Sequence, residues 1–186
     1  MKIVKGVGTH VALLRGINVG GKNRVTMEDL VALFADAGCG DVRTYIQSGN
    51  VVFQARATVA KRVPNLVAAV ISDRFGYRVP VVTRTAEEIS DVVRDNPFLG
   101  PGADTNQLHV AFLADVPSAV SVAALDSDRS PPDAFSVRGR EIYLRCPNGL
   151  ARTKLTNGYF DSELATTSTV RNWKTVLKLL ELTVAQ

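Results

Sequence analysis

One short pattern that occurs twice constrains the fold of this chain more than any other feature. The segment HVALL at residues 10–14 returns as HVAFL at residues 109–113, and both segments are apolar runs typical of buried strands. In each half, a helix and then a β-hairpin are predicted to follow the strand. The repeated order of elements indicates an internal duplication in which each half forms its own sheet.

The first half is predicted to have the order β-α-β-β-α-β, which is the split arrangement of ferredoxin-like folds. Thr26 is positioned to cap the first helix, and Ser48-Gly49 is the predicted turn between two β-branched and aromatic strands. Pro64 is expected to delay the start of the second helix or to kink it. The predicted elements are a strand at 10–15, a helix at 26–37, strands at 42–47 and 50–53, a helix within 59–75 and a strand at 79–82.

The second half repeats the strand, helix and hairpin of the first. Thr169 is a suitable N-cap for a final helix, which is predicted over residues 170–182. The remaining predicted elements are a helix at 86–94, a strand at 108–114, a helix at 118–125, a hairpin of 135–137 with 141–145, and helical turns near 158–164.

We therefore expect an α+β protein made of two ferredoxin-like halves, with antiparallel or mixed sheets and packed helices. Hairpins in both halves argue against one doubly wound parallel sheet. The expected divisions are an N-terminal extension at 1–9, a first ferredoxin-like half at 10–84, and a second half with a C-terminal helix at 85–186.

The composition is ordinary for a globular protein, with 46% hydrophobic and 22% charged residues. Two cysteines, Cys39 and Cys146, and two histidines, His10 and His109, are not spaced like metal ligands, so neither a metal nor a cofactor is expected. No signal peptide or membrane span is predicted, which indicates a soluble, cytoplasmic protein. The net charge of +4 mildly favours anionic partners and leaves the oligomeric state open.

Residues 16–23, GINVGGKN, match the phosphate-binding loop G-x-x-x-x-G-K-[ST] except at Asn23. That motif needs a hydroxyl at its last position to ligate magnesium, and a helix that starts directly after the lysine. Here the helix is predicted to start four residues after Lys22, at Thr26. The pattern therefore argues against a nucleotide triphosphatase.

The surrounding segment 15–24, RGINVGGKNR, contains three cations and no acid. Its glycines permit unusual backbone angles, so the loop could form a nest of amides that binds an anion. The alternative is a glycine-rich connection with solvated charges. The candidate ligand-binding residues in this loop are Arg15, Asn18, Gly20, Gly21, Lys22 and Asn23.

Two further segments supply candidates. Gln47, Ser48 and Asn50 surround the first hairpin turn, where turn chemistry is the alternative explanation. Arg171 and Asn172 are expected in the first turn of the final helix, near exposed N–H groups. A cation there is unfavourable unless it pairs with an acid or binds an anion.

The segments ALLRGINVGGKN, TYIQSGNVVF, NPF, EIYLRCPNG and TVRNWKTVLKLLEL together resemble a bacterial family, the domain-of-unknown-function family 1697. The resemblance covers nearly the whole chain from His10 onward and implies a duplicated ferredoxin-like fold. It implies no activity and no catalytic residues. Residues 1–9 look like an addition to the family's pattern.

The sequence favours a binding module for an anionic ligand, either nucleic acid or a phosphorylated small molecule. Two alternatives remain, a protein-interaction or structural domain, and an enzyme that uses Lys22, Arg171 and backbone amides as an electrophilic site. No constellation of acid, base and nucleophile is recognisable. The strand aromatics do not form an RNA-binding signature; they are Tyr45, Phe53, Phe112, Phe135 and Tyr143.

Overall fold

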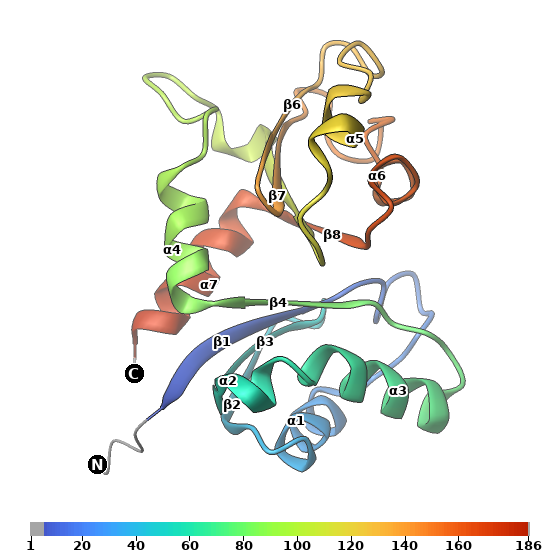
Figure 1. Cartoon of the computed structure of the whole chain (residues 1–186), viewed down its shortest axis with the longest axis vertical. Coiled ribbons are helices and arrows are strands. Elements are labelled where there is room, and N and C mark those ends of the chain that lie inside the picture. The colour runs from blue at the N-terminus through green and yellow to red at the C-terminus, as the bar shows by residue number, and fades with distance from the viewer. Residues whose placement is uncertain (1–5, 186) are drawn as a thin grey trace. The chain divides into compact units, whose positions relative to one another are not determined.

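The computed structural model describes residues 6–185 and contains two compact units (Figure 1). The first unit comprises residues up to Ser90 together with the C-terminal segment from Leu179, and the second comprises Asp91–Lys178. Each unit contains a four-stranded antiparallel sheet and helices, so the protein is α+β. The extension predicted at 1–9 falls partly outside the described residues, because residues 1–5 are not described.

The first unit contains a sheet whose strands lie in the order β2-β3-β1-β4. Its central strand β1 pairs with β3 on one side and with β4 on the other. The strands are β1 (Val7–Leu14), β2 (Gly40–Tyr45), β3 (Asn50–Arg56) and β4 (Val81–Thr85), and the helices are α1 (Met27–Asp36), α2 (Ala57–Ala60) and α3 (Val63–Phe75).

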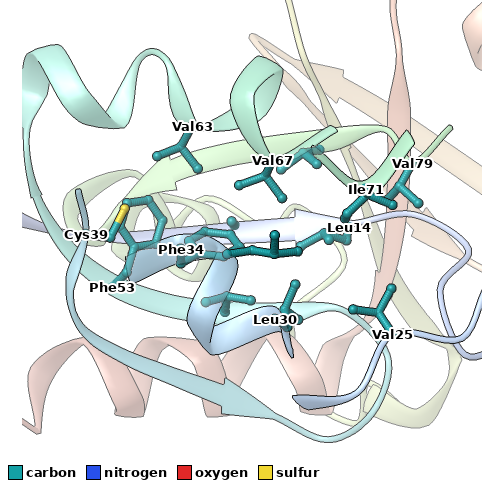
Figure 2. Packing of buried hydrophobic residues seen from close by; sticks show 14 of the residues in the cluster. Leu14, Val25, Leu30, Phe34, Cys39, Phe53, Val63, Val67, Ile71 and Val79 are labelled. Atoms are coloured by element: carbon teal, nitrogen blue, oxygen red, sulfur yellow. The ribbon is translucent and has the colours of Figure 1, made fainter. Parts of the chain in front are cut away.

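Alternation along the strands explains why α1 and α3 cover one face of this sheet (Figure 1). Every second side chain of β1 and β3 enters a core with the apolar faces of the two helices, as Figure 2 shows for Leu14, Phe34 and Phe53. The rings of Phe34 and Phe53 have centroids 5.3 Å apart. This core fixes the end of β1 and the start of β3, and therefore the position of the loop after β1 and of the turn before β3.

Local signals set the helix boundaries in this unit. Thr26 is the N-cap of α1, as predicted, and its hydroxyl accepts a hydrogen bond of 3.0 Å from Asp29 N. Pro64 lies in the first turn of α3, where its missing N–H costs nothing. The helical stretch predicted within 59–75 is divided in two, because α2 ends at Ala60 and α3 begins at Val63.

The second unit has the strand order β6-β7-β5-β8. Its strands are β5 (Leu108–Leu113), β6 (Ala134–Arg138), β7 (Glu141–Arg145) and β8 (Ser168–Asn172). The helices α5 (Ala119–Ala123) and α6 (Asn157–Leu164) belong to it, and a short 3-10 turn at Thr105–Gln107 precedes β5. The helices α4 (Ala86–Arg94) and α7 (Trp173–Val184) directly follow β4 and β8, and each crosses the boundary between the units.

The start of the final helix was predicted wrongly. Residues 168–172 form the edge strand β8, which pairs with β5 through Val110 and Arg171, and α7 begins only at Trp173. The β-branched residues Thr169 and Val170 favour a strand, and completing the sheet outweighs the early capping signal of Thr169. The true cap is Asn172, whose Oδ1 accepts a hydrogen bond of 2.8 Å from Thr175 N.

Candidate functional site

The glycine pair of the first loop forms a tight turn. Lys22 N donates to Val19 O at 3.0 Å, and the two central residues, Gly20 and Gly21, have φ of 58° and 75°. Positive φ at both positions is the mark of a type I′ turn, for which Gly-Gly is a favoured sequence. Because α1 begins only at Met27, this loop lacks the geometry of a phosphate-binding loop of nucleotide triphosphatases.

Asn18 holds the loop to its surroundings through its side-chain amide. Its Oδ1 accepts from Val25 N at 3.0 Å, while its Nδ2 donates to Val25 O at 2.9 Å and to Gln47 O at 3.0 Å. The side chain of Asn23 closes the other side of the loop by donating to Gly16 O at 3.0 Å. Both asparagines have positive φ, which asparagine tolerates, so both have a structural role in the loop.

The β2–β3 turn packs directly against the end of β1. Gly49 has a φ of 74°, and a Cβ placed there would lie 2.8 Å from both Cβ and O of Leu14. The same approach allows Leu14 N to donate to Gly49 O at 2.8 Å. Asn50 is fully buried, and its Nδ2 donates to Tyr45 O and to Ser48 Oγ. Ser48, Gly49 and Asn50 therefore serve the turn.

The structure brings these two segments together around a pocket of about 630 Å³. The hydrogen bond from Asn18 Nδ2 to Gln47 O joins them at the pocket wall. The start of α1 forms another part of the wall. The lining residues are Asn18, Gly21, Arg24, Val25, Thr26, Met27, Glu28 and Gln47.

The pocket has basic surroundings. Arg24 is an exposed lining residue, and its carbonyl accepts a hydrogen bond of 2.7 Å from Tyr77 Oη, which fixes the backbone at this point. Lys22 is exposed on the turn beside it. Arg15, also in this loop, is half-buried, and its N–H donates to Pro80 O at 2.9 Å. The first turn of α1 adds the amides of Met27 and Glu28, which have no intrahelical acceptor.

Arg171 and Asn172 belong to the second unit and are not part of this pocket. Arg171 is buried, and its Nη1 donates to Thr169 Oγ1 and to Val170 O, both at 2.8 Å. Burial lowers the pKa of Arg171 to about 10. The expectation that this cation lies in the first turn of a helix is wrong, because it lies on strand β8.

Sequence reasoning missed a second buried arginine, Arg84, which is 1% exposed on β4. Its Nη1 donates to Thr83 O at 2.8 Å. Nη1 of Arg171 makes the equivalent hydrogen bond to Val170 O, so each arginine donates to the carbonyl of the residue before it. Each arginine directly precedes the residue that caps the next helix, Thr85 or Asn172. The sequence signal that could have found them is an arginine followed by a capping residue directly before a helix, as in Arg84-Thr85 and Arg171-Asn172. The pocket residues Arg24, Val25, Thr26, Met27 and Glu28 were likewise not predicted as ligand-binding.

The cysteines and histidines are poorly suited to catalysis. Burial raises the pKa of Cys39 and of Cys146 to about 11, so both thiols stay protonated at neutral pH. Burial lowers the pKa of His10 and of His109, which favours neutral rings. Among residues 6–185, no group of three His, Cys, Asp or Glu side chains is arranged to hold a metal ion.

Within residues 6–185, no helix is both long enough and apolar enough to cross a bilayer.

Comparison with known proteins identifies first the fold and then the family. The solved structure of a conserved bacterial protein, SP0830 from Streptococcus pneumoniae, is similar with a TM-score of 0.72 and 20% sequence identity, over 95% of this chain and 99% of that chain. A family model described as "Protein of unknown function (DUF1697)" matches residues 7–143, and the chain belongs to this family. The match begins three residues before His10, where the motifs suggested that the family pattern starts. No curated protein matches the chain.

Proposed function

We propose that this protein binds a small ligand that carries a phosphate or a similar anionic group in the pocket of the first unit. The observation that carries the proposal is a pocket of about 630 Å³ with Arg24 in its wall and the start of α1 beside it. This volume is within the range of small-molecule sites. An arginine and unpaired amides at a helix N-terminus are groups that bind phosphate oxygens.

Burial of three of the five strand aromatics favours a small molecule over nucleic acid. Phe53, Phe112 and Tyr143 are all buried, so their ring faces are not available for stacking bases. The ring of Phe135 packs edge-on against Phe160, with centroids 5.9 Å apart. A ferredoxin-like sheet that binds RNA needs such rings on an open face.

Binding of pyrophosphate tests the proposal, measured by titration calorimetry at low ionic strength. We expect saturable binding that Arg24→Ala weakens by about fivefold or more, because a charge-assisted hydrogen bond is lost. The matched control is Arg56→Ala, since Arg56 is also exposed but pairs with Val7 at the opposite end of β1. Absence of saturable binding, or equal effects of the two variants, contradicts the proposal.

Glu28 provides a second, opposite test of the same site. It is the acidic residue in the pocket wall, and its carboxylate repels an anionic ligand. We expect Glu28→Gln to tighten pyrophosphate binding by about twofold to fivefold, as befits an exposed charge. Weaker binding in this variant contradicts an anionic ligand in the pocket.

A protein-interaction role is the second candidate function. The segment around α5 exposes two large apolar side chains, Val116 at 69% and Val120 at 81%. Exposed apolar residues close together in sequence are typical of interaction surfaces. Sedimentation equilibrium tests self-association through this segment: a concentration-dependent mass that Val120→Asp abolishes supports this role, and a strict monomer counts against it.

We also propose that each unit is a ferredoxin-like fold and that the two arose by duplication. Their strand orders correspond one to one, β2-β3-β1-β4 with β6-β7-β5-β8. Hydrogen bonds at matching positions support this. Leu14 N and Leu113 N donate to the turns of the two hairpins, and the next residues, Arg15 and Ala114, donate to the segments before β4 and β8. In experimental coordinates of the two units, the Cα atoms of the eight strands should superimpose in these pairs. A different pairing contradicts duplication.

A further inference from the structure

We propose that the ligand of the first unit's pocket is an amphiphile, with an aliphatic chain attached to its anionic group. This inference rests on the proposed function and names the ligand class for the same site. It depends on exposed apolar side chains beside the pocket-lining residues in sequence, which the anion-binding groups do not explain.

Two aliphatic residues that are next in sequence to pocket-lining residues have exposed side chains. Val19 is 62% exposed and Ile46 is 53% exposed. Each is the immediate neighbour in sequence of a pocket-lining residue, Asn18 or Gln47, and those two residues are joined by the hydrogen bond of 3.0 Å. The hydrogen bond therefore holds together, at the pocket wall, the two backbone segments that carry the aliphatic residues. Among the apolar lining residues, Met27 is half-buried against the core, and Val25 is 2% exposed and belongs to the core.

The backbone at Ile46 indicates that this exposure is maintained against a cost. Ile46 has a φ of 48°, in the left-handed region that β-branched residues rarely adopt. Asparagine or glycine would adopt this conformation at a lower free energy and would be better solvated. An isoleucine that is both strained and half-exposed points to an apolar contact with a ligand.

The charges decide what that ligand is. Lys22 and Arg24 lie close in sequence to Val19, on the same loop, and both are exposed. Two copies of this surface would repel each other, so a second copy of the chain is a poor occupant. Adjacent cationic and aliphatic groups match a molecule that joins an anionic head to an aliphatic chain. Such a molecule is either free in solution or part of a bilayer.

A series of phosphate monoesters tests the inference, with inorganic phosphate, ethyl, butyl and octyl phosphate as monomeric probes in titration calorimetry. Affinity should rise with chain length, by up to about fourfold for each methylene that becomes fully buried. The double variant Val19→Ser with Ile46→Asn should flatten this dependence and leave the affinity for inorganic phosphate within about twofold of wild type. The matched control is Val120→Ser, which removes an exposed valine from the second unit.

The outcomes separate this inference from the proposed function. Binding of phosphate and pyrophosphate with no dependence on chain length overturns the amphiphile and leaves the anion site. Binding of none of the phosphates, whether free or in vesicles, overturns both. Thermal unfolding of the double variant shows whether it is folded, and Val19→Ser alone should give a smaller flattening in the same direction.

A vesicle arm distinguishes the two sources of an amphiphile. Co-sedimentation with vesicles of phosphatidic acid in phosphatidylcholine, compared with phosphatidylcholine alone, measures binding to a lipid head group in a bilayer. If the wild-type protein binds the acidic vesicles and the double variant does not, the result supports a membrane lipid as the amphiphile. Binding to octyl phosphate without binding to vesicles supports a free amphiphile. Vesicle binding that the double variant retains overturns the apolar contact.

Discussion

The two units share a strand order and differ in the connection that follows β1 in the first unit and β5 in the second. In the first unit, residues 15–26 connect β1 to α1, carry three cations and form one wall of a pocket. In the second unit, residues 114–118, ADVPS, connect β5 to α5, with an acid and no cation. Asp115 N donates to Thr166 Oγ1 at 3.1 Å, so this short connection is held against the segment before β8.

The difference between the two connections coincides with the position of the proposed ligand site, which lies only in the first unit. The hydrogen-bonded positions of the sheets match, from the N–H groups of Leu14 and Leu113 to the buried Arg84 and Arg171. A loop can be lengthened without loss of the core, because its ends are fixed by the strands. The longer connection, with its type I′ turn and its asparagine contacts, is the feature on which the proposed ligand site depends.

Substitutions in the two hairpin turns should give the largest difference between the units in the loss of unfolding free energy. Gly49→Ala should destabilise the protein by about 3 kcal/mol or more, because the new Cβ meets backbone and side chain of Leu14 at a positive φ. Gly139→Ala changes the corresponding turn between β6 and β7, where the nearest atom lies 3.9 Å away. It should cost about 1 kcal/mol, for its positive φ alone. Equal costs in urea unfolding contradict the close approach at Gly49.

The asparagines of the first connection should give the next largest effect. Asn18→Gly keeps the positive φ and removes three hydrogen bonds, so we expect a loss of about 2 kcal/mol in the free energy of unfolding. Asn23→Gly is the matched control, because it removes one exposed hydrogen bond at a similar φ. Its cost should be below about 1 kcal/mol. If the two costs are alike, Asn18 does not organise the loop.

The caps that follow the buried arginines should give smaller and equal effects. Thr85 caps α4, with its Oγ1 accepting from Glu88 N at 3.1 Å, and Asn172 caps α7. We expect Thr85→Ala and Asn172→Ala each to cost about 1 kcal/mol in chemical denaturation. The glycine variants should cost only a few tenths of that amount. If the two alanine variants lose clearly different amounts of unfolding free energy, the two caps do not contribute equally to stability.

The two histidines should give the smallest effect, seen only in the pH dependence of stability. Burial lowers the pKa of His10 and of His109 below the ordinary value of 6.5. The unfolded chain therefore binds protons more readily than the folded protein as the pH falls below 6.5, and stability decreases there. His10→Gln and His109→Gln should each reduce the loss of melting temperature between about pH 7 and about pH 5.5. An unchanged pH profile in both variants contradicts neutral, buried rings.

Much of the secondary structure was predictable, because local signals and tertiary packing agree there. The cap at Thr26, the position of Pro64 in the first turn of α3 and the two hairpins all follow from side-chain chemistry within a few residues. The prediction failed at residues 168–172, where Thr169 is a suitable cap but the empty edge beside β5 requires a strand. Local sequence contains no information about a strand edge that lies far away along the chain.

The candidate site was predictable only in part. The cations and glycines of 15–24 were recognised, and the Gly-Gly pair is itself a turn signal, yet the amide contacts of Asn18 with Val25 and Gln47 were not foreseeable. Arg171 and Asn172 were grouped with this loop as candidates, although they lie on the second unit.

By itself, the sequence determined the kind of element at most positions, the repeated order of those elements and the family. These depend on periodicity, capping and motif, which act within a short stretch of chain. The tertiary structure alone decided that the turn at 46–49 lies beside the loop at 15–24, that Gly49 must be a glycine, and that Arg84 is buried. Each of these depends on an approach between segments distant in sequence, and packing of the sheet and helices, not local preference, sets that approach.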